Sequence, residues 1–293
     1  MLYKKTVSSF LRLAFAALII LSVLLMPCCI REDNTTDKPI IAVTIVPEHT
    51  FVKEVCGDLV EIITLIAPGY SPESYEPAPN EIERFSKADL YFTIGLAAEE
   101  ISIIPNITED IKVIALQNEV SSVYADRMFT ENSRDPHIWL SPKRVKIMIK
   151  AIAREVSALD PSNADIYNKN ADEYIKQLNS LDEYIKNIIG QMENKSFIAF
   201  HPAFGYLAED YGMTMYALQK EGKEAAPRHL QEMVDLAKKE GIKAIFYQEE
   251  IDSRQAKAFA DEIGGRTVKL APLSADYIDN LMLMADTLAK ELK

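Results

Sequence analysis

Apolar residues recur along this chain in two patterns, short continuous runs and longer stripes at helical spacing. The continuous runs are rich in β-branched residues, as in residues 40–46, which is typical of strands buried on both faces of a parallel sheet. The stripes recur every three or four residues and predict helices between the strands. The expected strands are 40–46, 60–66, 90–94 and 112–114, then 197–200, 213–218, 242–247 and 267–270. This alternation predicts an α/β fold with two lobes, each built on a parallel sheet.

A long helical stripe separates the two sets of strands. Near the start of residues 159–192, Asp160 is a suitable N-cap and Pro161 fits the first helical position. The stripe that follows comprises Ile166, Asn170, Tyr174, Leu178, Leu181, Ile185, Ile188 and Met192. A helix of this length is roughly 45 Å long. We therefore expect an N-terminal lobe over 40–160, a rigid linking helix over 161–193 and a C-terminal lobe over 194–293.

Other helices are expected over 50–55, 81–87, 203–212, 227–240 and 253–263, and from about residue 275 to the end. Ser141 and Pro142 form an N-cap and first-turn pair that opens a further helix reaching Leu159. Residues 118–134 are polar and aperiodic, which predicts a long surface loop.

The first 29 residues have the pattern of an export signal. Lys4, Lys5 and Arg12 precede an apolar run of about 14 residues, which is short for a membrane span. The run ends at Cys28 and Cys29, which indicates a lipoprotein anchored outside the cytoplasm through one of these cysteines, with an uncleaved anchor or plain secretion as the alternatives. Residues 30–39 are polar and are interpreted as a tether.

The charge of the chain restricts its partners. The formal net charge is −12, and without the first 29 residues 29 basic residues face 44 acidic ones. This balance argues against nucleic acid as a partner, since phosphate binding needs a basic face. Only Cys56 remains beyond the signal, so no disulfide is expected within the folded lobes.

Four histidines and one acidic loop supply the candidate metal ligands. His201 lies just beyond the expected strand 197–200, and the carboxyl ends of parallel strands face the ligand crevice. His137 lies in a rigid turn, DPHIWLSP, and Glu73 lies in a loop restricted by prolines, GYSPESYEPAP. His49 opens a helix and is a weaker candidate, whereas His229 lies inside a helix and is expected at the surface.

One carboxylate and two imidazoles can hold zinc and also suit manganese. Spacing alone is a weak signal here, because the three residues are far apart in the sequence. The chain has no HExxH, no CxxC pair, no Gly-rich phosphate loop and no GxSxG. The side chains of Tyr167, Tyr174 and Tyr184 are expected to contribute to helix packing, not to a ligand site.

Several long stretches, in order, resemble the metal-binding lipoproteins that supply zinc- and manganese-importing ABC transporters, of the cluster A-I type. The matching stretches are SPESYEP, FSKADLYFTIG, DPHIWLSP, DPSNADIYNKNADEYIKQLNSLD, FHPAFGYLAEDYGM, IKAIFYQ and LAPLSADYIDNL. The resemblance implies two α/β lobes joined by one rigid helix, with the metal between them. It also implies that His137 and His201 are ligands and that a membrane permease is the partner.

The chain departs from this family at two positions. The family usually has His at the position of Glu73. A carboxylate at this position can also bind metal, and it adds one negative charge. The family often has an acidic ligand in the stretch that matches LAPL, where this chain has Ala271. The fourth ligand is therefore open among Asp276, His49 and water.

The expected function is capture of a divalent cation, zinc in preference to manganese, outside the cytoplasm for an ABC importer. Two alternatives come from other classes. Two His and one Glu with an open position are also the ligands of catalytic zinc hydrolases, although no general base lies near them in sequence. A surface adhesion or structural lipoprotein with a decayed metal site is the other, because Ala271 replaces a usual ligand.

Overall fold

The computed structural model describes residues 38–73, 75–220, 225–251 and 254–292, which belong to one compact unit. The expected export signal, both of its cysteines and most of the tether lie outside the described residues. Among the helices of the described part, none is both long and apolar enough for a bilayer.

The first sheet forms from the N-terminal strands. Its members are β1 (Ile40–Val43), β2 (Glu61–Thr64), β3 (Leu90–Thr93) and β4 (Lys112–Ala115). All pairings are parallel and the order is β2-β1-β3-β4. The accompanying helices are α2 (Val46–Cys56), α3 (Pro79–Phe85), α4 (Leu116–Ser121) and α5 (Pro142–Leu159). Ser141 caps α5 as expected, since its hydroxyl accepts the Arg144 N–H.

The second sheet forms from the strands after the long helix. Its members are β7 (Ser196–Ala199), β8 (Thr214–Ala217), β9 (Ala244–Gln248) and β10 (Arg266–Leu270). The pairings are again parallel and the order is β10-β9-β7-β8. Its helices are α7 (Gly205–Asp210), α8 (Pro227–Glu240), α9 (Arg254–Glu262) and α10 (Tyr277–Glu291).

Both sheets have the same strand order when each is counted from its own first strand. The second sheet, read from β8 to β10, repeats the order second-first-third-fourth of the first sheet. In each sheet the chain reverses its direction of winding beside the first strand. Such a switch point opens a crevice at the carboxyl ends of the strands. The two-lobed parallel α/β prediction is therefore confirmed.

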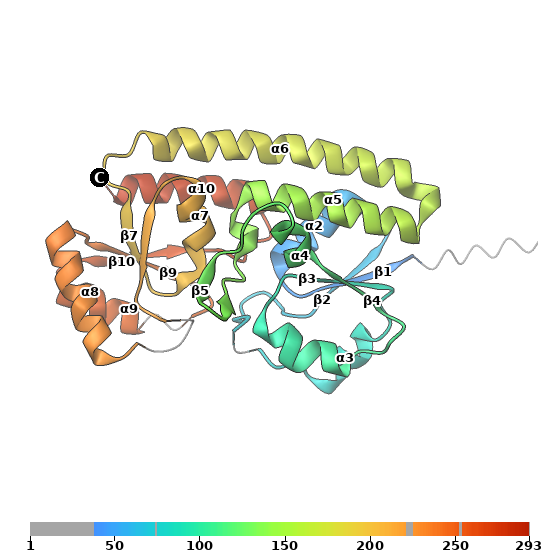
Figure 1. The fold of residues 1–293 in the computed structure, drawn as a ribbon, viewed down its shortest axis with the longest axis horizontal. Helices are drawn as coiled ribbons and strands as arrows, with labels where there is room; N and C mark the ends of the chain where they lie inside the picture. The colour runs from blue at the N-terminus through green and yellow to red at the C-terminus, as the bar shows by residue number, and fades with distance from the viewer. Residues whose placement is uncertain (1–37, 74, 221–224, 252–253, 293) are drawn as a thin grey trace, which may run out of the picture. The chain divides into compact units, whose positions relative to one another are not determined.

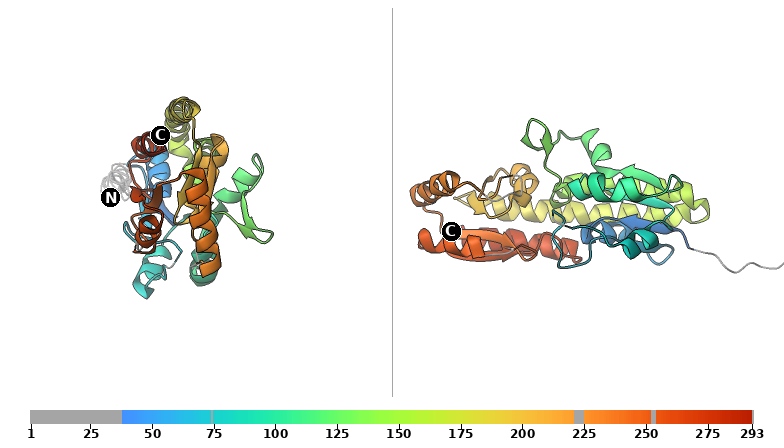
Figure 2. Two further views of the ribbon diagram at one scale, coloured as in Figure 1. Left: turned by 90° about the vertical axis from the view of Figure 1, so that its left-hand side faces the viewer. Right: turned by 90° about the horizontal axis from the view of Figure 1, so that it is seen from below.

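The helix α6 (Ala164–Gly190) connects the two sheets in sequence and packs against elements of both. It contacts α2 and α5, which accompany the first sheet, and α10, which accompanies the second. Figure 1 shows α6 passing the β1–β4 sheet near its first turns and the β7–β10 sheet near its last turns, and Figure 2 shows α10 running beside it. At 1.5 Å per residue, 27 residues span about 40 Å.

The start of this helix differs from the prediction. Residues Pro161–Asn163 form a 3-10 turn, and the α-helix begins three residues later than expected. The Asp160 carboxylate accepts hydrogen bonds from Ser162, Asn163 and Tyr167, so it organises the turn between α5 and α6. The buried stripe consequently includes Tyr167, while Ile166 is 45% exposed.

Residues 118–134 differ most from their predicted structure. They were expected to form a surface loop, but they continue α4 and then form the hairpin of β5 (Met128–Thr130) and β6 (Ser133–Arg134). Its strands are two or three residues long, which is too short for a period-2 pattern to be visible in the sequence. The hairpin returns the chain to Asp135 and His137.

Side chains alternate along the strands of the second sheet, so its two faces pack into two separate hydrophobic clusters. Phe197, Ala199 and Phe246 face the main core that includes α6, α7 and α10. Ile198 and Ile245, one residue out of step, face a separate cluster with α8 and α9. Helices therefore cover both faces of the sheet, and the carboxyl ends of its strands remain for a site.

Candidate metal centre

Glu73, His137 and His201 converge on one point. Among the described residues, these three form the one group of acidic, His or Cys side chains that could hold a metal ion together. Glu73 Oε1 lies 3.0 Å from His201 Nε2 and 3.6 Å from His137 Nε2. The two Nε2 atoms are 3.3 Å apart. Residues separated by as many as 128 positions therefore meet, as the sequence analysis required.

Glu73 comes from the loop between β2 and α3. Pro72 and Pro77 restrict the loop backbone, and the Ser71 hydroxyl donates to the Glu73 carboxylate. The side chain of Glu73 is 30% exposed, whereas those of both histidines are almost fully buried. The carboxylate therefore forms the solvent side of the centre.

His137 follows the β5–β6 hairpin and is fixed by Asp135. One oxygen of the buried Asp135 carboxylate accepts both the His137 backbone N–H at 3.0 Å and its Nδ1–H at 2.7 Å. An ionised carboxylate can only accept, so Nδ1 carries the proton. The Nε2 atom is thereby directed at the centre, and metal-bound histidines usually have such a carboxylate on their other nitrogen.

His201 lies two residues beyond β7, at the switch point of the second sheet. The register pairs Ala199 with Ala217, so Gln219 lies level with His201 on the neighbouring strand extension. The Gln219 Oε1 accepts the Nδ1–H of His201 at 2.9 Å. This histidine therefore also presents Nε2, but its supporting partner is a neutral amide rather than a carboxylate.

The electrostatics of the centre favour a bound cation. Burial alone would lower the pKa of His137, but the hydrogen bond and charge of Asp135, with those of Glu73, raise it to about 9. Burial alone would raise the pKa of Glu73, yet hydrogen bonds from His137 and His201 and their charges hold it well below its usual range. Both shifts show that positive charge is stabilised next to Glu73, and a bound cation would take the place of the His137 proton.

The three distances match the face of a zinc tetrahedron. With ligand bonds of about 2.0–2.1 Å and tetrahedral angles, neighbouring ligand atoms lie roughly 3.3 Å apart. The observed separations of 3.0, 3.3 and 3.6 Å bracket this value. The atoms can therefore hold an ion with shifts of a few tenths of an ångström, and no rearrangement of the lobes is needed.

The other candidates lie elsewhere. His49 Nδ1 is 2.9 Å from the Thr64 hydroxyl, and His229 is half-buried with Nε2 3.0 Å from the Ala217 carbonyl oxygen. Asp276 is an exposed residue at the start of α10 and is not part of the group of three. Ala271 offers no side-chain ligand, and its carbonyl accepts from Asn280.

The sequence analysis missed the residues that orient the imidazoles, Asp135 and Gln219. Asp135 had a readable signal, because an Asp whose side chain accepts the N–H two residues later forms a common local turn. Gln219 had none, since only the pairing of β7 with β8 brings it beside His201.

Comparison with known proteins identifies the family of this chain. The family model described as zinc-uptake complex component A, periplasmic, matches residues 41–291. The high-affinity zinc uptake system protein ZnuA of Bacillus subtilis is 30% identical over 256 residues, covering 82% of this chain and 80% of that protein. A putative metal-binding protein of Chlamydia muridarum is 27% identical and covers 88% and 93% of the two chains.

Solved structures give the same result for the fold. A crystal structure of ZnuA superposes with a TM-score of 0.82 at 30% identity, covering 88% of this chain and all of that one. The laminin-binding protein Lmb of Streptococcus agalactiae, titled a bifunctional protein with adhesin and metal-transporting activity, has a TM-score of 0.78 at 26% identity. It covers 87% of this chain and all of that one.

Proposed function

Because the chain belongs to the family of periplasmic zinc-uptake component A proteins, we propose that Glu73, His137 and His201 are its zinc ligands. Members of this family are extracytoplasmic solute-binding proteins of ABC uptake systems, and they are binding proteins rather than enzymes. The single observation that supports the three ligands best is the spacing of their donor atoms, which suits one tetrahedral ion.

Zinc is the preferred cargo and manganese the alternative. Two imidazole nitrogens and one carboxylate are typical of zinc, whereas manganese favours sites richer in oxygen. Ala271 removes the acidic ligand that the family often has, but Glu73 supplies a carboxylate where the family usually has His, so the preference for zinc rests on the two imidazoles. Of the three alternatives for the fourth ligand, water would have access from the exposed side of Glu73, whereas Asp276 and His49 do not belong to the group of three.

Transport requires that the protein stay near its permease after export. Cys28 or Cys29 would carry the lipid that anchors the chain to the cell membrane, and residues 30–39 would keep the lobes clear of it. The permease of an ABC importer would then receive the ion. Because α6 packs against elements of both sheets, we expect release through a small shift rather than a wide closure.

Isothermal titration of metal-stripped protein with zinc and with manganese tests this function. The unaltered chain should bind zinc with a dissociation constant well below about 1 μM, which is a binding free energy more favourable than about −8 kcal/mol. Glu73→Ala and His201→Ala should weaken binding strongly, while His229→Ala, a matched control, should not. Failure of the unaltered chain to bind either metal at this level would overturn the proposal.

A further inference from the structure

We propose that Asp135 and Arg127 form a positioning pair for His137, and that the elements around α7 hold this pair in place from the other lobe. This inference rests on the proposed role of His137 as a ligand. Neither residue would touch the ion, yet both would set the affinity of the protein for zinc. His137, a proposed ligand in the first lobe, would thus depend on contacts with the second lobe.

Asp135 is the buried member of the pair. Its carboxylate is fully buried, with one oxygen committed to His137 and the other 3.2 Å from Arg127 Nε. A buried carboxylate is costly unless it is paired with a charge. The hairpin supplies that charge, because Met128 pairs with Arg134 and the Asp135 N–H donates to the Arg127 carbonyl at 2.9 Å.

Arg127 is held by residues that follow β7. Its backbone N–H donates to the Tyr206 hydroxyl at 2.9 Å. Gly205 provides the space, since a Cβ at this position would lie 2.1 Å from Arg127 Nε and 2.8 Å from Asp135 Oδ2. Glu209 is 3.8 Å from the Arg127 guanidinium, an ion pair of minor energy because Glu209 is half exposed.

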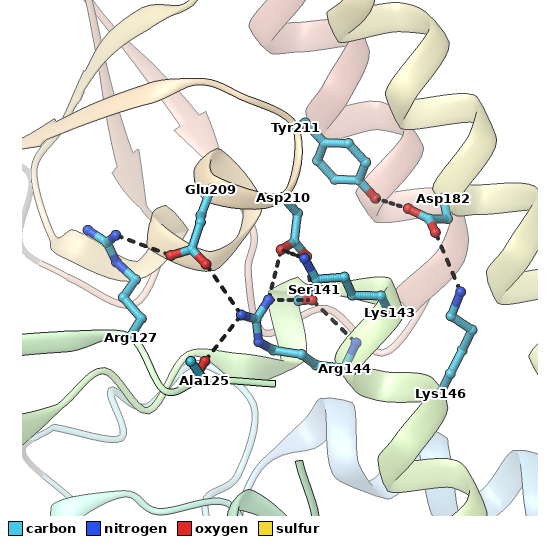
Figure 3. A network of polar contacts seen from close by, with 10 residues as sticks. All are labelled: Ala125, Arg127, Ser141, Lys143, Arg144, Lys146, Asp182, Glu209, Asp210 and Tyr211. Atoms are coloured by element: carbon cyan, nitrogen blue, oxygen red, sulfur yellow. Dashed lines mark hydrogen bonds and ion pairs between the residues drawn. The ribbon is translucent and has the colours of Figure 1, made fainter. Parts of the chain in front are cut away.

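The segment that holds Arg127 is itself fixed to α5. Arg144 donates to Asp210 at 2.8 Å, and the Ser141 hydroxyl donates to the same carboxylate at 2.5 Å. Figure 3 shows Arg127 and Arg144 on either side of Glu209, with Asp210 beside Ser141. Because α7 cannot shift without breaking these buried contacts, the position of Arg127 is tied to how the lobes meet.

His137 and His201 are therefore supported unequally. His201 has the neutral Gln219, whereas His137 has a carboxylate paired with Arg127 of the same hairpin, and Tyr206 of the other lobe holds that arginine. Removal of a residue that orients a ligand typically costs 10- to 100-fold in metal affinity. We expect about this loss from changes at Asp135 or Arg127, although neither contacts the ion.

Asp135→Asn, Arg127→Gln and Arg127→Lys test the pair, with Asp126→Asn as the matched control. Asp126 forms an ion pair with Arg134 at 2.7 Å on the same hairpin but contacts no proposed ligand. Zinc affinity would be measured by competition with a chelator on the full folded unit. Two further readouts would follow, the visible spectrum of the cobalt-loaded protein and the imidazole ¹⁵N signals that report which nitrogen binds metal.

Asp135→Asn and Arg127→Gln should each weaken zinc binding about 10- to 100-fold and alter the cobalt spectrum and the His137 signals. Arg127→Lys should recover part of the affinity, and Asp126→Asn should match the unaltered chain. If Glu73→Ala abolishes binding while Asp135→Asn and Arg127→Gln leave affinity and spectra unchanged, the positioning role is wrong and the metal site stands. An unaltered chain that binds no zinc overturns both.

Discussion

Replacement of Arg144 by Met should destabilise the protein far more than replacement of an exposed arginine on the same helix. The Arg144 side chain is buried and donates to Asp210 Oδ1, whose side chain is only 3% exposed. Its guanidinium also lies 4.3 Å from the centre of the Tyr206 ring. Methionine retains part of the aliphatic stem but removes the charge and its donors.

The magnitude follows from what remains around Asp210. Removing one partner of a buried ion pair typically costs about 3–5 kcal/mol, because the other charge is left uncompensated. Here Lys143 Nζ lies 2.5 Å from Asp210 Oδ1 and Ser141 still donates to the other oxygen, so part of the compensation survives. We therefore expect Arg144→Met to lower the free energy of unfolding by about 2–4 kcal/mol.

Urea unfolding of the zinc-free protein measures this loss. Trp139, the only tryptophan, is a suitable probe because it is buried and its indole N–H donates to the Pro272 carbonyl at 2.9 Å. Trp139 follows the first sheet and Pro272 follows β10, so separation of the lobes alters the fluorescence. Far-ultraviolet circular dichroism would record loss of helix in parallel.

Arg154→Met is the matched control. Arg154 also lies on α5 and pairs with Glu119 at 2.8 Å, but its side chain is 54% exposed. An exposed pair contributes at most about 1 kcal/mol. If Arg144→Met cost no more than Arg154→Met, the buried network would not contribute to stability as argued.

Three further predictions concern the metal centre and a buried acidic pair. Glu73→His, which restores the family's usual residue, should retain zinc binding by calorimetry, whereas Glu73→Ala should lose it; equal affinities of the two variants would contradict the role of Glu73. Because the pKa of His137 is raised to about 9 and metal must displace its proton, zinc affinity should fall roughly tenfold per pH unit from pH 8 to 6, and a constant dissociation constant would argue against this. Burial, with the charge of Glu99, raises the pKa of Glu48 well above its ordinary value of 4.5, so the folded state keeps a proton that the unfolded chain releases, and stability is full below pH 4.5 and declines above it. Glu48→Gln should therefore stabilise the protein at pH 8 by about 1 kcal/mol or more and not at pH 4.5, as thermal unfolding at the two pH values would reveal.

Strands and their sheets were predictable because buried parallel strands are continuous apolar runs, and each of the eight expected strands overlaps an observed one. Helix α8 begins at Pro227 and ends before Gly241, as the proline and glycine signals indicate. The hairpin around Met128 was not predictable, since its strands are only two or three residues long and contacts with Asp135 and Tyr206 stabilise it.

The three members of the centre were predictable as candidates, but the residues that support them were not. Spacing alone left Glu73, His137 and His201 weak candidates, and the resemblance to a family selected them. Their convergence depends on the carboxyl ends of strands and on loops, which a sequence specifies only loosely. Arg127 and Gly205 carry no local signal, because their relation exists only when two distant segments meet.

Two sheets with the same strand order suggest that the chain could be divided at α6, yet neither half contains all three residues of the centre. A fragment that ends before α6 keeps Glu73 and His137, and the remainder keeps His201. Separately produced fragments would therefore regain zinc capture only on reassembly, which would make the metal itself a reporter of fragment complementation.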